Sequence, residues 1–168
     1  LKEVNGALVE RGLRAVALKG ASVIQDLYSA AGMRPLSDID LWIRREDYPV
    51  VYSMLKELGF ANAWPGMDMV LTRTNWAIDL HFTPLNQIDG AFELNAEEAW
   101  ATAIPLFVCF PGICRLSPEL DLVVALIHAT KHSFSRLIWL VDILLMLDRL
   151  PREKVVEVVS RCRAGRCL

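Results

Sequence analysis

The chain has 168 residues, of which 54% are apolar, and a formal net charge of −2. This length fits one domain, or one domain with a small appendage, and is enough to bury a sizeable core. The weak charge argues against binding of long nucleic acid, which requires clustered Lys and Arg. No apolar run approaches the ~20 residues that span a bilayer, and no signal peptide pattern is visible. We therefore expect a cytoplasmic protein without a membrane span, and the high apolar content leaves room for a protein partner or a homo-oligomer.

The first part of the chain predicts alternating helices and strands. In chain order these are a helix over 2–12, a strand over 14–18, a helix over 21–31, an acidic strand over 37–43 and a helix over 46–58. Three strands follow at about 60–64, 68–73 and 76–82, separated by turn signals such as Pro65-Gly66. We expect residues 96–103 to be helical, and 106–110 with 113–116 to form a short hairpin.

Helical periodicity dominates after Ser117-Pro118-Glu119, because serine is a favoured N-cap and proline is favoured at the first helical position. Helices are predicted over 119–133, 136–150 and 152–163. With a boundary near 104–117, the chain divides into a core over 1–104 and a helical carboxyl-terminal region over 105–168. The predicted fold class is α+β, a small mixed β-sheet flanked by helices and followed by a helical region.

Two aspartates lie one residue apart in the acidic strand. A strand points alternate side chains to one face, so Asp38 and Asp40 are expected side by side, with Ile39 and Leu41 on the other face. Two carboxylates this close repel, and each raises the pKa of the other unless a cation lies between them. Mg²⁺ or Mn²⁺ is the natural candidate, since carboxylates and substrate phosphates hold such ions. The alternative is a solvated edge strand, against which the apolar neighbours argue.

A third aspartate, Asp79, lies in the strand predicted over 76–82. In two-metal phosphoryl transfer, paired ions hold the attacking and the leaving oxygen. A third carboxylate on a neighbouring strand can bind the ion that activates the incoming hydroxyl and can take its proton. We therefore predict Asp38, Asp40 and Asp79 as metal-binding and catalytic residues. His81 shares the strand face of Asp79, and either shapes the site or packs as an ordinary strand histidine.

The segment Lys19-Gly20-Ala21-Ser22 lies where a strand turns into a helix. Glycine permits close approach of the backbone to a ligand, and a helix amino terminus offers N–H groups to phosphate. Lys19 could add a positive charge. An ordinary strand-to-helix turn with a surface lysine is the alternative, but the position just before the acidic strand favours a phosphate-binding loop.

Taken together, these segments resemble the uncharacterised nucleotidyltransferase family of the DNA polymerase beta superfamily. The residues that carry the resemblance in the core are Leu18-Lys19-Gly20-Ala21-Ser22, Leu27-Tyr28, Arg34-Pro35-Leu36-Ser37-Asp38-Ile39-Asp40-Leu41 and Asp79-Leu80-His81. In the helical region they are Leu116-Ser117-Pro118-Glu119, His128, Lys131-His132 and Trp139-Leu140-Val141-Asp142.

The resemblance implies transfer of a nucleoside monophosphate from an NTP to a hydroxyl-bearing acceptor, with release of pyrophosphate. Gly20, Ala21 and Ser22 match the superfamily's phosphate loop, Asp38 and Asp40 its metal pair, and Asp79 its third acid. The superfamily often has Gly-Ser or Gly-Gly in the loop, so Ala21 removes a serine hydroxyl unless Ser22 replaces it. Members usually run longer, so part of the helical region is expected to be missing. The acceptor, whether protein, sugar, RNA or small molecule, is left open.

Two basic residues complete the predicted nucleotide site. Arg34 precedes the acids and could reach a phosphate or pair with Asp38, and Lys131 could face the cleft to hold the triphosphate or lie on a solvated helix face. Asp142 interrupts an apolar helix and needs a partner, because a buried charge is costly. We expect that partner to be Lys131, His132 or Arg136, in an ion pair that locks two helices.

Other polar residues have ordinary explanations. The pairs Cys109/Cys114 and Cys162/Cys167 have a spacing that zinc sites permit, but reduced thiols are favoured over a zinc site or a disulfide. His128 and His132 are four apart on one helix, without an obvious third zinc ligand. A non-catalytic nucleotide-sensing or antitoxin-like module is the main alternative function, which the three acids oppose, and a metal-dependent phosphohydrolase is a weaker one.

Overall fold

A mixed β-sheet forms the centre of the protein in the computed structural model, which describes residues 1–85, 93–163 and 166–167. The strand order in the sheet is β3 (Ala61–Asn62), β4 (Val70–Arg73), β5 (Trp76–His81), β2 (Ile39–Trp42), β1 (Ala15–Leu18), β8 (Ile113–Arg115) and β7 (Ile104–Pro105). β2 pairs with β5 and β1 with β8 in parallel, whereas the other neighbours are antiparallel. The prediction of a small mixed sheet flanked by helices is confirmed.

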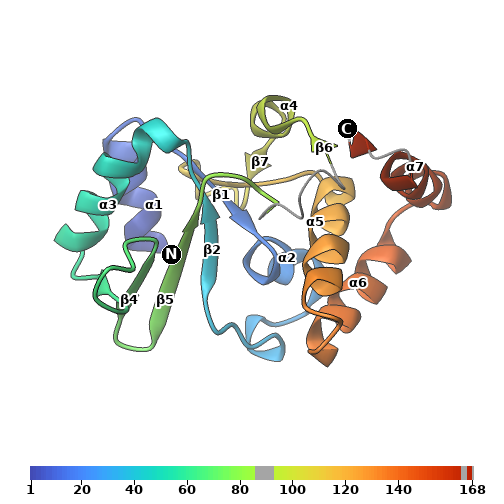
Figure 1. Ribbon diagram of the computed structural model, residues 1–168, viewed down its shortest axis with the longest axis horizontal. Helices are drawn as coiled ribbons and strands as arrows, with labels where there is room; N and C mark the ends of the chain where they lie inside the picture. Colours follow the sequence, from blue (N-terminus) through green and yellow to red (C-terminus); the bar gives the residue numbers. More distant parts are fainter. Residues whose placement is uncertain (86–92, 164–165, 168) are drawn as a thin grey trace.

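Helices cover both faces of this sheet (Figure 1). They are α1 (Lys2–Glu10), α2 (Gly20–Leu27), α3 (Tyr48–Glu57), α4 (Ala96–Ala101), α5 (Pro118–Lys131), α6 (Leu137–Arg149) and α7 (Arg152–Arg163), with 3₁₀ turns η1 (Ala31–Met33) and η2 (Arg45–Asp47). A separate parallel pair joins β6 (Glu93–Leu94) to β9 (Arg166–Cys167). Figure 1 shows α1 and α3 on one side of the sheet, and α2, α5 and α6 on the other.

Strand alternation divides the buried apolar residues into two clusters. Ala15, Ala17, Ile39 and Leu41 pack with α1 and α3, whereas Val16, Leu18 and Trp42 pack with α2, α5 and α6. Successive side chains of a strand point to opposite faces, so the position of each residue decides which layer it joins. Asp40 follows Ile39 and therefore faces the layer of α5 and α6.

The helix after Ser117 begins as predicted. The Ser117 side chain accepts a hydrogen bond from the backbone N–H of Leu120, with Pro118 as the first residue of α5. β7 and β8 belong to the same sheet as the preceding strands, so the continuous helical part begins at α5. The division into a core over 1–104 and a helical region over 105–168 stays a prediction.

The second predicted helix is shorter than expected. It ends at Leu27 rather than at residue 31, because Tyr28 has extended backbone angles of φ −118° and ψ 137°. The extended backbone at Tyr28 accompanies a hydrogen bond from its hydroxyl to Asp142 of α6, at 2.6 Å. Local periodicity continued past Leu27, but the structure favours this long-range contact.

The predicted first strand of the hairpin, over 106–110, is wrong. The strand is Ile104–Pro105, which pairs with β8, and the apolar run that follows forms the connecting turn. The rings of Phe107 and Phe110 pack with their centroids 4.9 Å apart, and the Phe110 N–H bonds the Phe107 carbonyl. The run is apolar because part of it packs on the core, as Leu106 does at 4% exposure, and not because it is a strand.

Within the described ranges, no helix is long and apolar enough to cross a membrane. Cys109 is exposed and Cys114 is buried, and both are free thiols. The side chains of Cys162 and Cys167 lie outside the described residues.

Candidate active site

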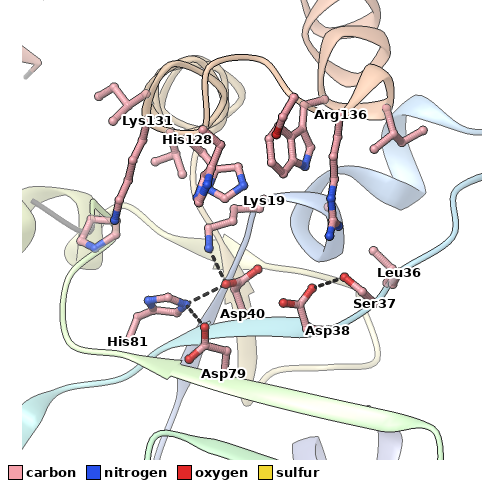
Figure 2. A pocket seen from close by; sticks show the side chains of 18 of the residues that line it. Lys19, Leu36, Ser37, Asp38, Asp40, Asp79, His81, His128, Lys131 and Arg136 are labelled. Atoms are coloured by element: carbon pink, nitrogen blue, oxygen red, sulfur yellow. Dashed lines mark hydrogen bonds and ion pairs between the residues drawn. The ribbon is translucent and has the colours of Figure 1, made fainter. Parts of the chain in front are cut away.

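The register between β2 and β5 brings two aspartates together. Asp40 and Asp79 are directly paired across these parallel strands, and Leu18 at the end of β1 pairs with Asp40 on the other side. Directly opposed residues point to the same face of a sheet. Figure 2 shows both carboxylates pointing into a pocket between the sheet and the α5–α6 helices. The adjacency thus comes from strand pairing as well as from the Asp-x-Asp spacing.

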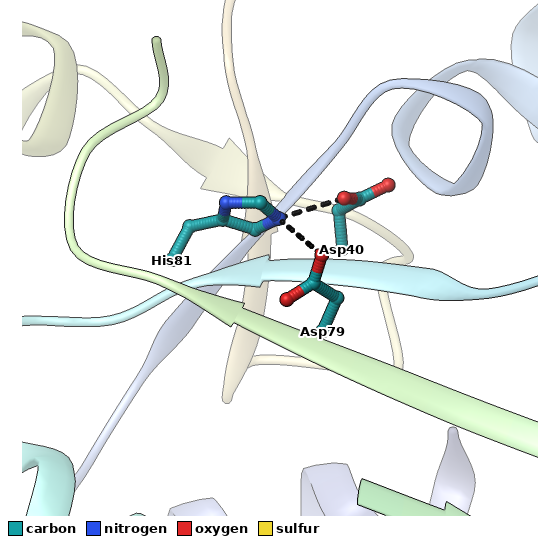
Figure 3. Close-up of side chains that lie close together, drawn as sticks. All are labelled: Asp40, Asp79 and His81. Atoms are coloured by element: carbon teal, nitrogen blue, oxygen red, sulfur yellow. Dashed lines mark hydrogen bonds and ion pairs between the residues drawn. The ribbon is translucent and has the colours of Figure 1, made fainter. Parts of the chain in front are cut away.

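His81 completes a cluster with these two acids. Its Nε2 lies 2.7 Å from Asp40 Oδ1 and 3.4 Å from Asp79 Oδ2 (Figure 3). The three residues each offer a ligand atom within 4.8 Å of the others, which makes them a possible metal-binding group among the described residues. Asp40 and His81 are buried, whereas the Asp79 side chain is 30% exposed.

Two cationic neighbours hold the Asp40 carboxylate ionised. Burial alone would raise the pKa of Asp40, but the hydrogen bond from His81 and the charge of Lys19 hold it below its usual value. Burial would lower the pKa of His81, but its bonds to Asp40 and Asp79 raise it to about 9. His81 is therefore protonated at neutral pH, and two cationic groups, His81 and Lys19, balance the acids.

Asp38 lies at the edge of this cluster. It is exposed, immediately precedes β2, and accepts a hydrogen bond from the Ser37 hydroxyl at 2.8 Å. Figure 2 shows its carboxylate pointing into the same pocket as that of Asp40. The structure thus places Asp38 on the pocket lining but outside the group formed by Asp40, Asp79 and His81.

Lys19 connects the strand-to-helix turn to the acids. Its Nζ lies 2.5 Å from Asp40 Oδ1, and its backbone has φ 56° and ψ −133°, a region that few residues other than glycine adopt. The predicted phosphate-loop lysine is thus a partner of the central carboxylate in the ligand-free protein.

The other loop residues face different surroundings. A Cβ placed on Gly20 would lie 2.6 Å from the Arg34 guanidinium, so any larger residue here would displace that buried group. The Ala21 side chain packs in the core, and the buried Ser22 hydroxyl contacts the Lys19 carbonyl and Asp121. Gly20 and Lys19 line the pocket, whereas the Ser22 hydroxyl is engaged beneath the loop.

We expect Gly20→Ala to disturb both folding and the site, because the Arg34 guanidinium has to move from beneath the loop. A loss of about 1–3 kcal/mol in the free energy of unfolding, measured by urea titration, is the expected magnitude for such overpacking. Gly6→Ala, where a Cβ meets nothing within 4 Å, is the matched control in helix α1. A Gly20→Ala protein as stable as Gly6→Ala would contradict the close contact with Arg34.

Arg34 has a different partner from the one expected. Its guanidinium pairs with Asp142 of α6 at 2.7 Å, not with Asp38, and both side chains are buried. The partner of Asp142 is therefore Arg34, together with the Tyr28 hydroxyl, and not Lys131, His132 or Arg136. Asp142 thus forms a buried ion pair as expected, but the pair joins α6 to the segment before β2 and not to a neighbouring helix.

Basic and aromatic side chains form the opposite wall of the pocket, whose volume is about 780 Å³. They come from the end of α5, the beginning of α6 and the turn between them: His128, Lys131, His132, Arg136 and Trp139. Figure 2 shows His128, Lys131 and Arg136 extending from this wall toward the acids. An anionic substrate with a bound cation would fit between the two walls.

His128 is half-buried against Trp139, with ring centroids 4.6 Å apart. Burial, reinforced by the charge of Lys19, lowers its pKa to about 4. Since the ordinary pKa is 6.5, the unfolded chain takes up this proton as pH falls below 6.5 and the folded protein does not until about pH 4. The contribution of His128 to the free energy of unfolding is therefore lost as pH falls from 6.5 to 4.

We expect the free energy of unfolding of His128→Gln, measured by urea titration, to fall less steeply than that of wild type between pH 6.5 and pH 4. An equal slope in the two proteins would contradict a buried neutral His128.

The structure thus brings Lys19, Gly20, Arg34, Asp38, Asp40, Asp79 and Lys131 to one pocket. Arg136 and Trp139 also line this pocket and were not among the predicted site residues, and His81, for which the sequence left a role in the site open, lines it too. The alternation Asp79-Leu80-His81 was a usable signal for His81. No pattern in the sequence places Arg136 and Trp139 in the pocket, because their position depends on how α6 packs on α5.

The fold is shared with solved nucleotidyltransferase structures. The solution structure of the antibiotic-resistance factor ANT(2'')-Ia matches with a TM-score of 0.70 and 16% identity, over 97% of this chain and 89% of that chain. The crystal structure of ANT(2'')-Ia in complex with adenylyl-2''-tobramycin matches with a TM-score of 0.69 and 16% identity, over 97% of this chain and 94% of that chain. No curated protein matches the chain in sequence.

A family model described as an uncharacterised nucleotidyltransferase matches residues 1–168. The chain belongs to this family, as its sequence motifs predicted.

Proposed function

We propose that this protein transfers a nucleoside monophosphate from an NTP, with ATP as the first donor to test, to a hydroxyl-bearing acceptor. The observation that carries the proposal is the pairing of Asp40 with Asp79 on a pocket floor that faces the basic wall of Lys131 and Arg136. Such a pocket provides separate places for cations and for the anionic triphosphate. NTP as the donor points to the cytoplasm as the location.

Asp38, Asp40 and Asp79 are proposed to hold Mg²⁺ or Mn²⁺. Carboxylate oxygens are the ligands that such hard cations prefer, and in the ligand-free protein Lys19 and His81 pair with Asp40, and His81 also with Asp79. This donor set fits a divalent ion, which would supply charge neutralisation at the phosphates and a more acidic acceptor hydroxyl.

The turn at the start of α2 is proposed to bind the triphosphate. Gly20 and Ala21 present the amino end of the helix, where N–H groups favour phosphate. With a divalent cation held by the acids, Lys19 would be free to turn from Asp40 to a phosphate oxygen, and Lys131 would approach from the opposite wall. The Arg34 guanidinium lies against Gly20 and is proposed to contact the triphosphate there, while its charge is balanced by Asp142. Ser22 acts through its bond to the Lys19 carbonyl.

Asp79 is the proposed proton acceptor. The acceptor oxygen forms a bond to the α-phosphorus, the bond from that phosphorus to the β-phosphate oxygen breaks, and pyrophosphate leaves with the bonding electron pair. The hydroxyl proton passes to Asp79, whose carboxylate is 30% exposed to the pocket. Asp40 is less suited, because it is buried and bonded to both Lys19 and His81.

Isothermal titration of the protein with each NTP in the presence of Mg²⁺ tests the binding part of this proposal. We expect saturable binding of at least one NTP by wild type and clear weakening in the Asp38→Ala/Asp40→Ala double variant. Equal binding by the two proteins would refute the assigned site.

A further inference from the structure

A buried carboxyl group outside the pocket contacts the proposed phosphate loop from below. Asp121, on the first turn of α5, is only 3% exposed, and its Oδ1 lies 2.9 Å from the Ser22 hydroxyl. The Ser22 hydroxyl in turn lies 2.8 Å from the Lys19 carbonyl oxygen. These contacts form a chain from the interior of the helical layer to the residue that pairs with Asp40.

The two contacts of the Ser22 hydroxyl, with the Lys19 carbonyl and with Asp121, are both hydrogen bonds only if two protons are shared among these three groups. The Ser22 hydroxyl has one proton, which it can donate either to the Lys19 carbonyl or to Asp121. Burial raises the pKa of Asp121 to about 8, so its carboxyl group is protonated near neutral pH. A protonated Asp121 can donate to Ser22, which leaves the Ser22 proton for the Lys19 carbonyl.

This carbonyl belongs to a residue with a positive φ, which residues other than glycine rarely adopt. Lys19 has φ 56° and ψ −133°, a conformation that persists only where the surroundings hold it. Both the backbone N–H of Ser22, at 3.1 Å, and its hydroxyl contact the Lys19 carbonyl. The same conformation directs the Lys19 side chain to Asp40.

Packing alone gives no reason for a carboxyl group at position 121. Its neighbours Leu120, Leu122 and Val123 are buried apolar residues, and Asp121 borders a cavity of about 300 Å³. Apolar residues such as Val23, Leu27 and Met146 line part of this cavity, and the charged residues Asp26, Glu119, Arg115 and Arg149 line the rest, but none of these four bonds to Asp121. Asp121 Oδ2 has no hydrogen-bond partner among the described residues. A buried oxygen without a partner is destabilising, so an apolar side chain would suit this place at least as well.

We propose that Asp121, acting through Ser22, is a positioning residue that holds the Lys19 backbone in its unusual conformation and so aims Lys19 at the acidic site. The inference rests on the proposed function for its effect on the nucleotide, but the arrangement of the loop can be measured without any nucleotide.

The test compares Asp121→Leu, Asp121→Asn and Ser22→Ala with wild type. Hydrogen–deuterium exchange of peptides that cover residues 19–23 reports the loop, and titration with each NTP and Mg²⁺ reports the nucleotide. We expect Asp121→Leu and Ser22→Ala to exchange at least tenfold faster in this segment and to bind NTP at least fivefold more weakly. Asp121→Asn retains a hydrogen-bond donor and is expected to restore both values to near wild type.

A purely structural role would give a different pattern. Asp121→Leu is expected to keep a thermal midpoint equal to or above that of wild type, whereas the control Val123→Ala, on the same helix, lowers the midpoint without weakening NTP binding. Unchanged exchange and NTP binding in Asp121→Leu would overturn the inference. If wild type binds no NTP but Asp121→Leu still speeds exchange at 19–23, the loop assignment stands and the proposed function fails.

Discussion

Asp40→Asn is expected to lower nucleotidyl transfer at least a thousandfold, equivalent to about 4 kcal/mol of transition-state stabilisation. Asp40 is the central residue of the site, since it is buried, pairs with Asp79 across the strands and bonds both Lys19 and His81. An amide is a much weaker ligand for a divalent cation than a carboxylate, and it leaves Lys19 without its counter-charge and His81 with Asp79 alone. Release of pyrophosphate from NTP in the presence of acceptor measures the effect.

Asp148→Asn is the matched control, because Asp148 is exposed on α6 and outside the pocket lining. We expect activity within about twofold of wild type for this variant. A titration with Mn²⁺, followed by electron paramagnetic resonance, should show weaker binding by Asp40→Asn and not by Asp148→Asn. If Asp40→Asn retained more than a tenth of wild-type turnover, Asp40 would not be a metal ligand of this reaction.

Breaking the Arg34–Asp142 pair is expected to have the largest effect on stability. Removing one member of a buried ion pair costs about 3–5 kcal/mol, because the other charge is left uncompensated. Arg34 and Asp142 are 7% and 4% exposed, and Tyr28 donates to the same carboxylate. We therefore expect Arg34→Met and Asp142→Leu each to lower the free energy of unfolding in urea by this amount.

The double variant Arg34→Met/Asp142→Leu distinguishes the interaction between the two residues from what each contributes separately. Two apolar side chains leave no unpaired charge, so the double variant should be more stable than either single one. Glu3→Gln, which breaks the exposed pair with Arg73, is expected to cost less than about 1 kcal/mol. Additive losses in the double variant would show that the two residues contribute independently of their contact.

The sequence predicted those features of the pocket and the fold that depend on residues close together in the chain. The alternation Asp38-Ile39-Asp40-Leu41 predicted the face of each side chain, and the register of β2 with β5 then brought Asp40 to Asp79. The start of α5 could also be predicted from adjacent residues, because Ser117 caps a helix that begins at Pro118. In these segments the hydrophobic pattern and the polar signals agree.

Long-range contacts were the part that the sequence did not reveal. Arg34 and Asp142 are 108 positions apart, and nothing near either residue indicates their pairing. The local turn suggested that position 20 is glycine because a ligand approaches the backbone there. In the structure the group that approaches Gly20 is the Arg34 guanidinium of the protein itself. In the same way, the serine expected at a phosphate contacts Asp121, which lies 99 positions away.

The central claim is transfer of a nucleoside monophosphate, and the position of the label in the donor tests it most directly. The protein is incubated with Mg²⁺ and a cell extract, with NTP labelled either at the α- or at the γ-phosphate. We predict that the α-label enters an acceptor and the γ-label is recovered as pyrophosphate, and that Asp40→Asn abolishes both. Entry of the γ-label into an acceptor, or release of free phosphate without pyrophosphate, would contradict the account.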